Sequence, residues 1–184
     1  ERLSASAMSV TPAADAVAGA TALVSLKNGA LPSYSIIDMF LGNTPGVMGE
    51  VSALLLLAGG IYLVARRVIT WHIPVAYIAT VAVISFIFPQ MPGDTSFMAY
   101  ELFSGGLMLG AIFMATDYTT SPLTRRARLI YGVGCGLITV FIRYFGGFSE
   151  GVSFAILIMN LTVYYLDKFT RPVRFGGVAK NDKK

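Results

Sequence analysis

The stretch GEVSALLLLAGGIYLVARR, residues 49–67, decides the fold class of this chain. Fifteen residues without a charge, from Val51 to Ala65, follow Glu50 and end at the pair Arg66 and Arg67. With its flanks, this run approaches the roughly 20 residues that an α-helix needs to cross a bilayer. Lipid offers no hydrogen-bond partners, so such a run must satisfy its own backbone, and a helix is the structure that does so.

Four more apolar segments follow this first one. They run from about Ile73 to Phe88, Phe97 to Thr116, Leu129 to Phe145 and Val152 to Leu166, and the first runs from about Gly49 to Ala65. The pattern predicts an all-α, polytopic membrane helix bundle with about five transmembrane helices. We divide the chain into an extramembrane segment (1–46) rich in Ala, Ser, Gly, Thr and Pro, a five-helix membrane domain (47–170) and a basic cytoplasmic tail (171–184).

The composition supports a membrane protein. Apolar residues make up 55% of the 184 residues and charged residues 13%, and the mean hydropathy is +0.67, whereas soluble domains carry about 25% charged residues. The single Cys135 excludes an intrachain disulfide and an iron–sulfur cluster held by this chain alone. The chain starts at Glu1 and shows no signal peptide, so we expect a fragment of a longer protein.

The basic residues predict an orientation. If the helices alternate, eleven of the fourteen lysines and arginines fall on one side of the membrane and only Arg2, Lys27 and Arg143 on the other. The crowded side is expected to be cytoplasmic. The N-terminal segment then lies outside and the C-terminus inside. The net charge of +4 is explained by this asymmetry, so no nucleic-acid partner is expected.

Two glycine-rich motifs lie near the N-terminus. In Asp15-Ala16-Val17-Ala18-Gly19-Ala20-Thr21 the small residues leave room for a bulky group to approach the Thr21 hydroxyl, although a simple turn or helix start fits as well. In Gly42-Asn43-Thr44-Pro45-Gly46-Val47-Met48-Gly49-Glu50 a helix start could present backbone N–H groups to an anion, and an ordinary loop-to-helix junction is the alternative.

Two more motifs lie among the later segments. Phe113-Met114-Ala115-Thr116-Asp117 closes the third segment, and Ile142-Arg143-Tyr144-Phe145-Gly146-Gly147-Phe148-Ser149-Glu150-Gly151-Val152 joins the last two. Together with the first two motifs, in this order, they resemble the D subunit of Rnf electron-transport complexes, from the family shared with the B subunit of the Na⁺-translocating NADH:quinone reductase. The resemblance covers Asp15 to Gly177 and corresponds to the C-terminal half of the Rnf protein.

The resemblance implies a cofactor and partners. The Asp15–Thr21 stretch is similar to a flavinylation motif, with Ala18 where the family usually has Ser or Thr. It implies a covalent FMN joined through its phosphate to Thr21, with Gly19, Ala20, Asn43, Gly46 and Gly49 beside it, and a second flavin such as riboflavin between helices. The implied function is electron relay in an ion-translocating ferredoxin:NAD⁺ oxidoreductase of a bacterial or archaeal cell membrane. The implied partners are the other Rnf subunits, membrane lipid and a flavin transferase.

Three acidic residues near the ends of the segments are candidates for an ion path. Glu50 and Glu101 lie near the outer ends of the first and third segments, and Asp117 ends the third at the opposite face. Intramembrane carboxylates are costly and often mark ion paths; the alternative for Glu50 and Glu101 is a carboxylate that reaches the headgroups. Three other functions stay open: the B subunit of the quinone reductase, a cofactor-free transporter or channel component, and a structural membrane anchor.

Overall fold

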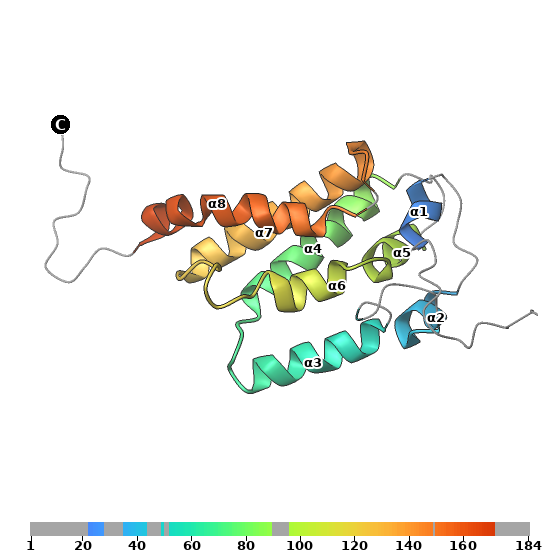
Figure 1. Cartoon of the computed structure of the whole chain (residues 1–184), viewed down its shortest axis with the longest axis horizontal. Helices are drawn as coiled ribbons and strands as arrows, with labels where there is room; N and C mark the ends of the chain where they lie inside the picture. Colours follow the sequence, from blue (N-terminus) through green and yellow to red (C-terminus); the bar gives the residue numbers. More distant parts are fainter. Residues whose placement is uncertain are drawn as a thin grey trace, which may run out of the picture.

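The computed structural model describes residues 22–27, 35–43, 49, 52–89, 96–148 and 150–171, and all regular structure in these ranges is helical. The elements, drawn in Figure 1, are α1 (Ala22–Lys27), α2 (Ile36–Leu41), α3 (Ala53–Ala65), α4 (His72–Ile87), α5 (Phe97–Phe103), α6 (Leu107–Leu109), the π-helix η1 (Gly110–Met114), α7 (Arg125–Phe145) and α8 (Val152–Thr170). The prediction of an all-α membrane protein is confirmed.

The five predicted apolar segments each correspond to helical structure, with changes at their ends. α7 begins at Arg125, four residues before the predicted Leu129, because the Thr124 side chain accepts a hydrogen bond from Ala127 N–H and starts the helix there. α8 continues to Thr170, beyond the predicted Leu166. α3 begins after Ser52, whose hydroxyl accepts from Leu55 N–H. Side-chain caps therefore set two of these starts.

The third segment differs from the single helix that we predicted over Phe97–Thr116. It is broken between α5 and α6, and the two parts are bent by 62°. Among the described residues, α7 and α8 are each long and apolar enough to cross a membrane, and the bent pair makes a third such unit if it is one span. α3 and α4, with 13 and 16 residues, are apolar but shorter, so the count of five spans stays a prediction.

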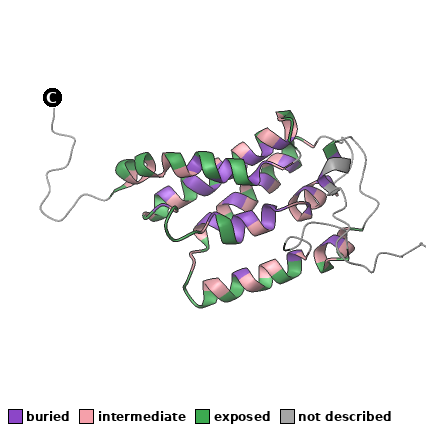
Figure 2. Ribbon diagram, in the orientation of Figure 1, coloured by how far each residue is buried: buried purple, intermediate pink, exposed green. Residues whose placement is uncertain are grey.

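The core lies where α4, α7, α8 and the α6–η1 unit meet. Its buried residues include Tyr77 and Val81 of α4, Ala111 of η1, and Tyr131 and Cys135 of α7. Figure 2 shows that the buried side chains face one another across these helices, while the outer faces of α3 and α8 carry exposed or intermediate residues. Many of the exposed residues are large and apolar. Such a surface suits contact with lipid rather than water.

α4 and α7 approach each other closely at two glycines. A Cβ added to Gly132 would lie 2.9 Å from the Ile73 carbonyl oxygen, and one added to Gly136 would lie 2.7 Å from Thr80 Cβ. Small residues spaced by four let membrane helices pack backbone against backbone. In the same interface, the hydroxyls of Tyr77 and Thr139 share a buried hydrogen bond of 2.5 Å.

The helices alternate in direction, as the charge pattern assumed. The α3–α4 turn, the loop after η1 and the end of α8 lie at one end of the molecule, while α1, α2 and the start of α5 lie at the other (Figure 1). The first end carries seven described cations: Arg66, Arg67, Arg125, Arg126, Arg128, Lys168 and Arg171. We call it the basic end. Which side of the membrane it faces stays a prediction.

Candidate functional site

The break between α5 and α6 brings together a polar cluster inside an otherwise apolar bundle. Gly105 turns the chain with a φ of +69°, a left-handed conformation that favours glycine. A Cβ at Gly105 would lie 3.4 Å from both Glu150 Oε1 and Leu23 Cδ1, so α1 and the α7–α8 loop close around the turn. Ser104, next to Gly105, is buried.

Arg143 of α7 binds the C-terminal end of α5. Its Nη1 donates to the Glu101 carbonyl oxygen at 2.8 Å and to Glu101 Oε1 at 3.0 Å, and its Nη2 donates to the Ser104 carbonyl oxygen at 3.4 Å. The last carbonyls of a helix lack partners within the helix and carry partial negative charge. A guanidinium, with five donors in a planar fork, can serve them and a carboxylate together. Arg143 therefore caps the broken end.

Glu150, in the α7–α8 loop, serves the other side of the break. One of its carboxylate oxygens accepts a hydrogen bond from Gly106 N–H, at the start of the α6–η1 unit. The positive end of a helix dipole favours a nearby anion, as the negative end favours a cation. The two half-helices are thus held apart by a cation at the end of one and an anion at the start of the other.

Glu101 and Arg143 are exposed by only 3% and 4%. The predicted ion-path candidate Glu101 therefore does not extend to the membrane surface in this structure, and its carboxylate is engaged by Arg143. Two buried polar atoms at the same place, Ser104 Oγ and Arg143 Nε, have no hydrogen-bond partner among the described residues. Broken helices with buried charges form ion sites in many transporters, so this cluster can serve ion movement chemically.

α1 lies against the same end of the bundle. Leu23 and Leu26 are buried, and Lys27 Nζ donates to the carbonyl oxygens of Gly146 and Phe148 at 2.6 and 3.0 Å. α1 begins at Ala22, the residue directly after Thr21. The predicted flavin-site residues Thr21, Gly19, Ala20 and Gly46, and the ion-path candidate Glu50, lie outside the described residues.

Asn43 and Gly49, the other two predicted flavin neighbours, lie between α2 and α3. Asn43 N–H donates to the Asp38 carbonyl oxygen at 2.8 Å, directly after the α2 C-cap Gly42. A Cβ at Gly42 would lie 2.9 Å from Ser52 Cβ, so the end of α2 contacts the start of α3. Gly49 has a φ of +99° and open space where a side chain would stand. This space fits a group that approaches the backbone.

Asp117 lies at the basic end, far along the bundle from Glu101 (Figure 1). Its Oδ2 accepts hydrogen bonds from the hydroxyls of Thr119 and Thr120 at 2.6 and 3.2 Å. The Thr119 hydrogen bond is the main cause that lowers the pKa of the Asp117 carboxyl below its ordinary value of 3.8. The structure therefore does not bring the two described ion-path candidates together, and Asp117 orders its own loop.

Several residues of the site were not predicted. Arg143 was expected as a free charge on the outer side, and Glu150 and Lys27 were given no role. A signal for the break was present in Ser104-Gly105-Gly106, because two glycines inside an apolar run weaken a helix. In the described part of the chain, no three His, Cys, Asp or Glu side chains come together as metal ligands.

Fold and site together define a polytopic membrane protein with one broken helix whose ends are held by buried charges. The chain belongs to the NQR2, RnfD, RnfE family, whose model matches residues 3–176.

The relatives carry more specific names, and each of the three that follow is the D subunit of its complex. The chain is 44% identical over 175 residues to that of the Na⁺-translocating ferredoxin:NAD⁺ oxidoreductase complex of Acetobacterium woodii, covering 94% of this chain and 53% of that protein. It is 44% identical over 139 residues to that of the proton-translocating ferredoxin:NAD⁺ oxidoreductase complex of Clostridium ljungdahlii, covering 75% and 42%. It is 41% identical over 181 residues to that of the ion-translocating oxidoreductase complex of Stutzerimonas stutzeri, covering 91% and 50%. The chain thus spans about half the length of these relatives.

Proposed function

We propose that this chain is part of the flavin-carrying membrane component of an ion-translocating ferredoxin:NAD⁺ oxidoreductase of the Rnf type. The observation that carries the proposal is the 44% identity over 175 residues to the D subunit of such a complex. The other subunits of the complex are then its partners, and a cell membrane is its location. The relatives named above include one sodium-translocating and one proton-translocating complex, so the coupling ion stays open.

The second part of the proposal is a covalent FMN on Thr21, attached by a flavin transferase. It is supported by the resemblance of Asp15–Thr21 to a flavinylation motif. The structure adds that the residue after Thr21 starts α1, a helix held to the bundle by Leu23, Leu26 and Lys27. A flavin at this point would be tethered to a fixed frame. The group supplies the redox chemistry, and the protein sets its position and environment.

The test is the covalent flavin of the full-length protein, matured with its transferase. Thr21→Ala is expected to abolish flavin fluorescence in a denaturing gel and the FMN mass adduct, while the protein still inserts into the membrane. Thr11→Ala and Ser25→Ala are matched hydroxyl controls that should keep both signals. Covalent flavin retained in Thr21→Ala but lost in a control would refute the site. Wild-type protein without flavin would refute the flavin-carrying function.

Two other candidates have specific support. The family description includes the quinone reductase protein NQR2, so the parent complex should be assayed for ferredoxin:NAD⁺ activity against quinone reduction. The buried Arg143–Glu101 pair at a broken helix also suits a transporter component without a cofactor. Ion uptake by vesicles that contain only this protein, without flavin, would favour that candidate over the redox function.

A further inference from the structure

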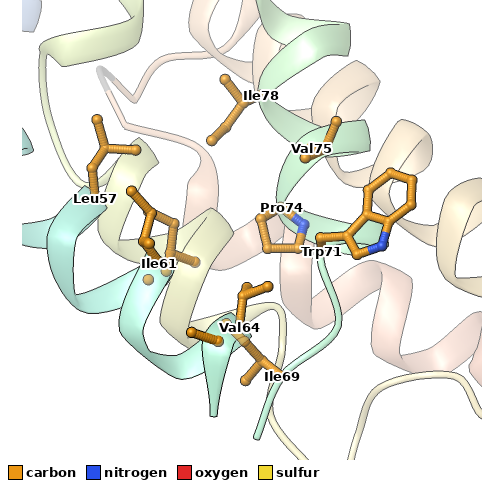
Figure 3. A pocket seen from close by; sticks show the side chains of 11 residues that line it. Leu57, Ile61, Val64, Ile69, Trp71, Pro74, Val75 and Ile78 are labelled. Carbon is orange, nitrogen blue, oxygen red and sulfur yellow. The ribbon is translucent and has the colours of Figure 1, made fainter. Parts of the chain in front are cut away.

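An apolar groove lies between α3 and α4, away from the broken helix. Its volume is about 410 Å³. Leu57, Ile61 and Val64 line it from α3, and Pro74, Val75 and Ile78 line it from α4, as Figure 3 shows. No lining residue except Trp71 has a polar atom in its side chain. A flavin ring needs hydrogen-bond partners along its edges, so this groove suits a hydrocarbon chain instead.

The length of the groove matches one membrane leaflet. The α3 residues that line it run from Leu57 to Ala65, which at 1.5 Å per residue is about 12 Å. Half of the hydrocarbon core of a bilayer is about 15 Å thick. The groove begins at the α3–α4 turn, at the basic end of the molecule, and continues toward the middle of the bundle. An acyl chain that entered at the turn would lie along the membrane normal.

The rim of the groove carries positive charge. Arg66 and Arg67 stand in the α3–α4 turn, between the lining residues Ala65 and Ile69, and both are exposed. Neither forms an ion pair with any described carboxylate. Trp71, half-exposed and stacked on His72 with ring centroids 4.3 Å apart, stands beside them. Arginine next to tryptophan at the end of an apolar groove is the arrangement that holds a phosphate at the headgroup level.

We propose that this groove binds one anionic phospholipid, with an acyl chain between α3 and α4 and the headgroup phosphate against Arg66 and Arg67. This site is independent of the flavin and of the ion path. The anionic headgroup is specified by charge, because the two arginines at the rim favour a phosphate that carries net negative charge. At about fivefold in affinity for each basic residue, the pair is worth about 25-fold.

The experiment uses the purified full-length protein in detergent. Phosphatidylglycerol with a photoactivatable acyl chain is added, cross-linked by light and mapped by peptide mass spectrometry; phosphatidylcholine with the same chain is the comparison. We expect phosphatidylglycerol to label the α3 and α4 peptides about 25-fold more efficiently at low concentration. Arg66→Gln/Arg67→Gln should reduce its labelling to the level of phosphatidylcholine. Arg125→Gln/Arg126→Gln, a second adjacent pair of exposed arginines, should leave it unchanged.

A variant of the groove itself tests the acyl-chain position. Val75→Trp fills the space between α3 and α4 at a half-exposed position, and should block labelling by both lipids. Leu161→Trp, on the exposed face of α8, is its control. Equal labelling by the two lipids, or unchanged labelling in the Arg66/Arg67 variant, would overturn the proposal. So would a groove that no lipid labels because another part of the protein covers it, as cysteine cross-links to Val75 would show.

Discussion

Replacement of Arg143 by methionine tests the role of the buried ion pair. The change removes the contact with Glu101 Oε1 and two hydrogen bonds to carbonyl oxygens at the end of α5. It also leaves the Glu101 carboxylate buried, at 3% exposure, without its cation. Breaking a buried pair from one side costs about 3–5 kcal/mol. We expect Arg143→Met to lower the free energy of unfolding by this amount.

The double variant separates the charge from the hydrogen bonds. Glu101→Met alone is also expected to cost about 3–5 kcal/mol, because it leaves a buried guanidinium. In Glu101→Met/Arg143→Met no charge is buried, and the loss is mainly two hydrogen bonds to backbone carbonyls, at about 1–1.5 kcal/mol each. The double variant should therefore lose about 2–3 kcal/mol, less than either single variant. The coupling energy between the two positions is then at least about 3 kcal/mol.

The assay is unfolding of the full-length protein by sodium dodecyl sulfate in mixed micelles, followed by circular dichroism. If Arg143→Met costs less than about 1 kcal/mol, Arg143 behaves as an exposed residue and the buried cap is refuted. If the double variant loses the sum of the two single losses, the residues are not coupled. Either result would also remove the pair as the feature that holds the break between α5 and α6.

Four other predictions concern function, orientation, packing and pH. Glu101→Gln should impair ion transport by the reconstituted complex more than its flavin content, because a buried carboxylate is better suited to moving ions than to attaching a cofactor; normal transport would refute this role. A reporter fused after Lys184 should be active only in the cytoplasm, and periplasmic activity would reverse the orientation. Gly132→Ala should cost about 1–3 kcal/mol, because its Cβ would lie 2.9 Å from a backbone oxygen of α4, whereas Gly147→Ala, with open space around it, should be neutral in the same unfolding assay. The pKa of Asp117 is lowered in the folded state, so its contribution to stability is present above pH 3.8 and lost as the pH falls through the lowered value; Asp117→Asn should flatten the acid limb of the stability curve, and an unchanged limb would contradict the loop contacts.

Helices and their alternation could be predicted from the sequence because they depend on local apolar runs and on the ends of those runs. Val152–Leu166, for example, contains no charge, and α8 covers it completely. The location of Cys135 in the helix core also agrees with packing of its side chain between helices. The ends of helices were less accurate where a cap such as Thr124 outweighed the adjacent arginines of α7.

The broken helix could not be predicted from the apolar pattern alone. Hydropathy averages over Ser104–Gly106, and the energy that compensates the break comes from Arg143 and Glu150, 42 and 44 residues away along the chain from their partners. Such contacts depend on tertiary packing. For the same reason Arg143 was wrongly counted as a free outer charge. With Arg143 buried and Lys27 bonded to the end of α7, both described cations outside the basic end are tied to protein atoms.

The close fit of α7 on α4 has a consequence for motion. A slide of α7 by one turn would bring Val140 to the place of Gly136, against Thr80, where there is no room even for a methyl group. The bond between Tyr77 and Thr139 would break as well. These two helices therefore behave as one rigid strut. Any change of shape during turnover must occur at its periphery, and Gly105 is the hinge that the described chain offers there.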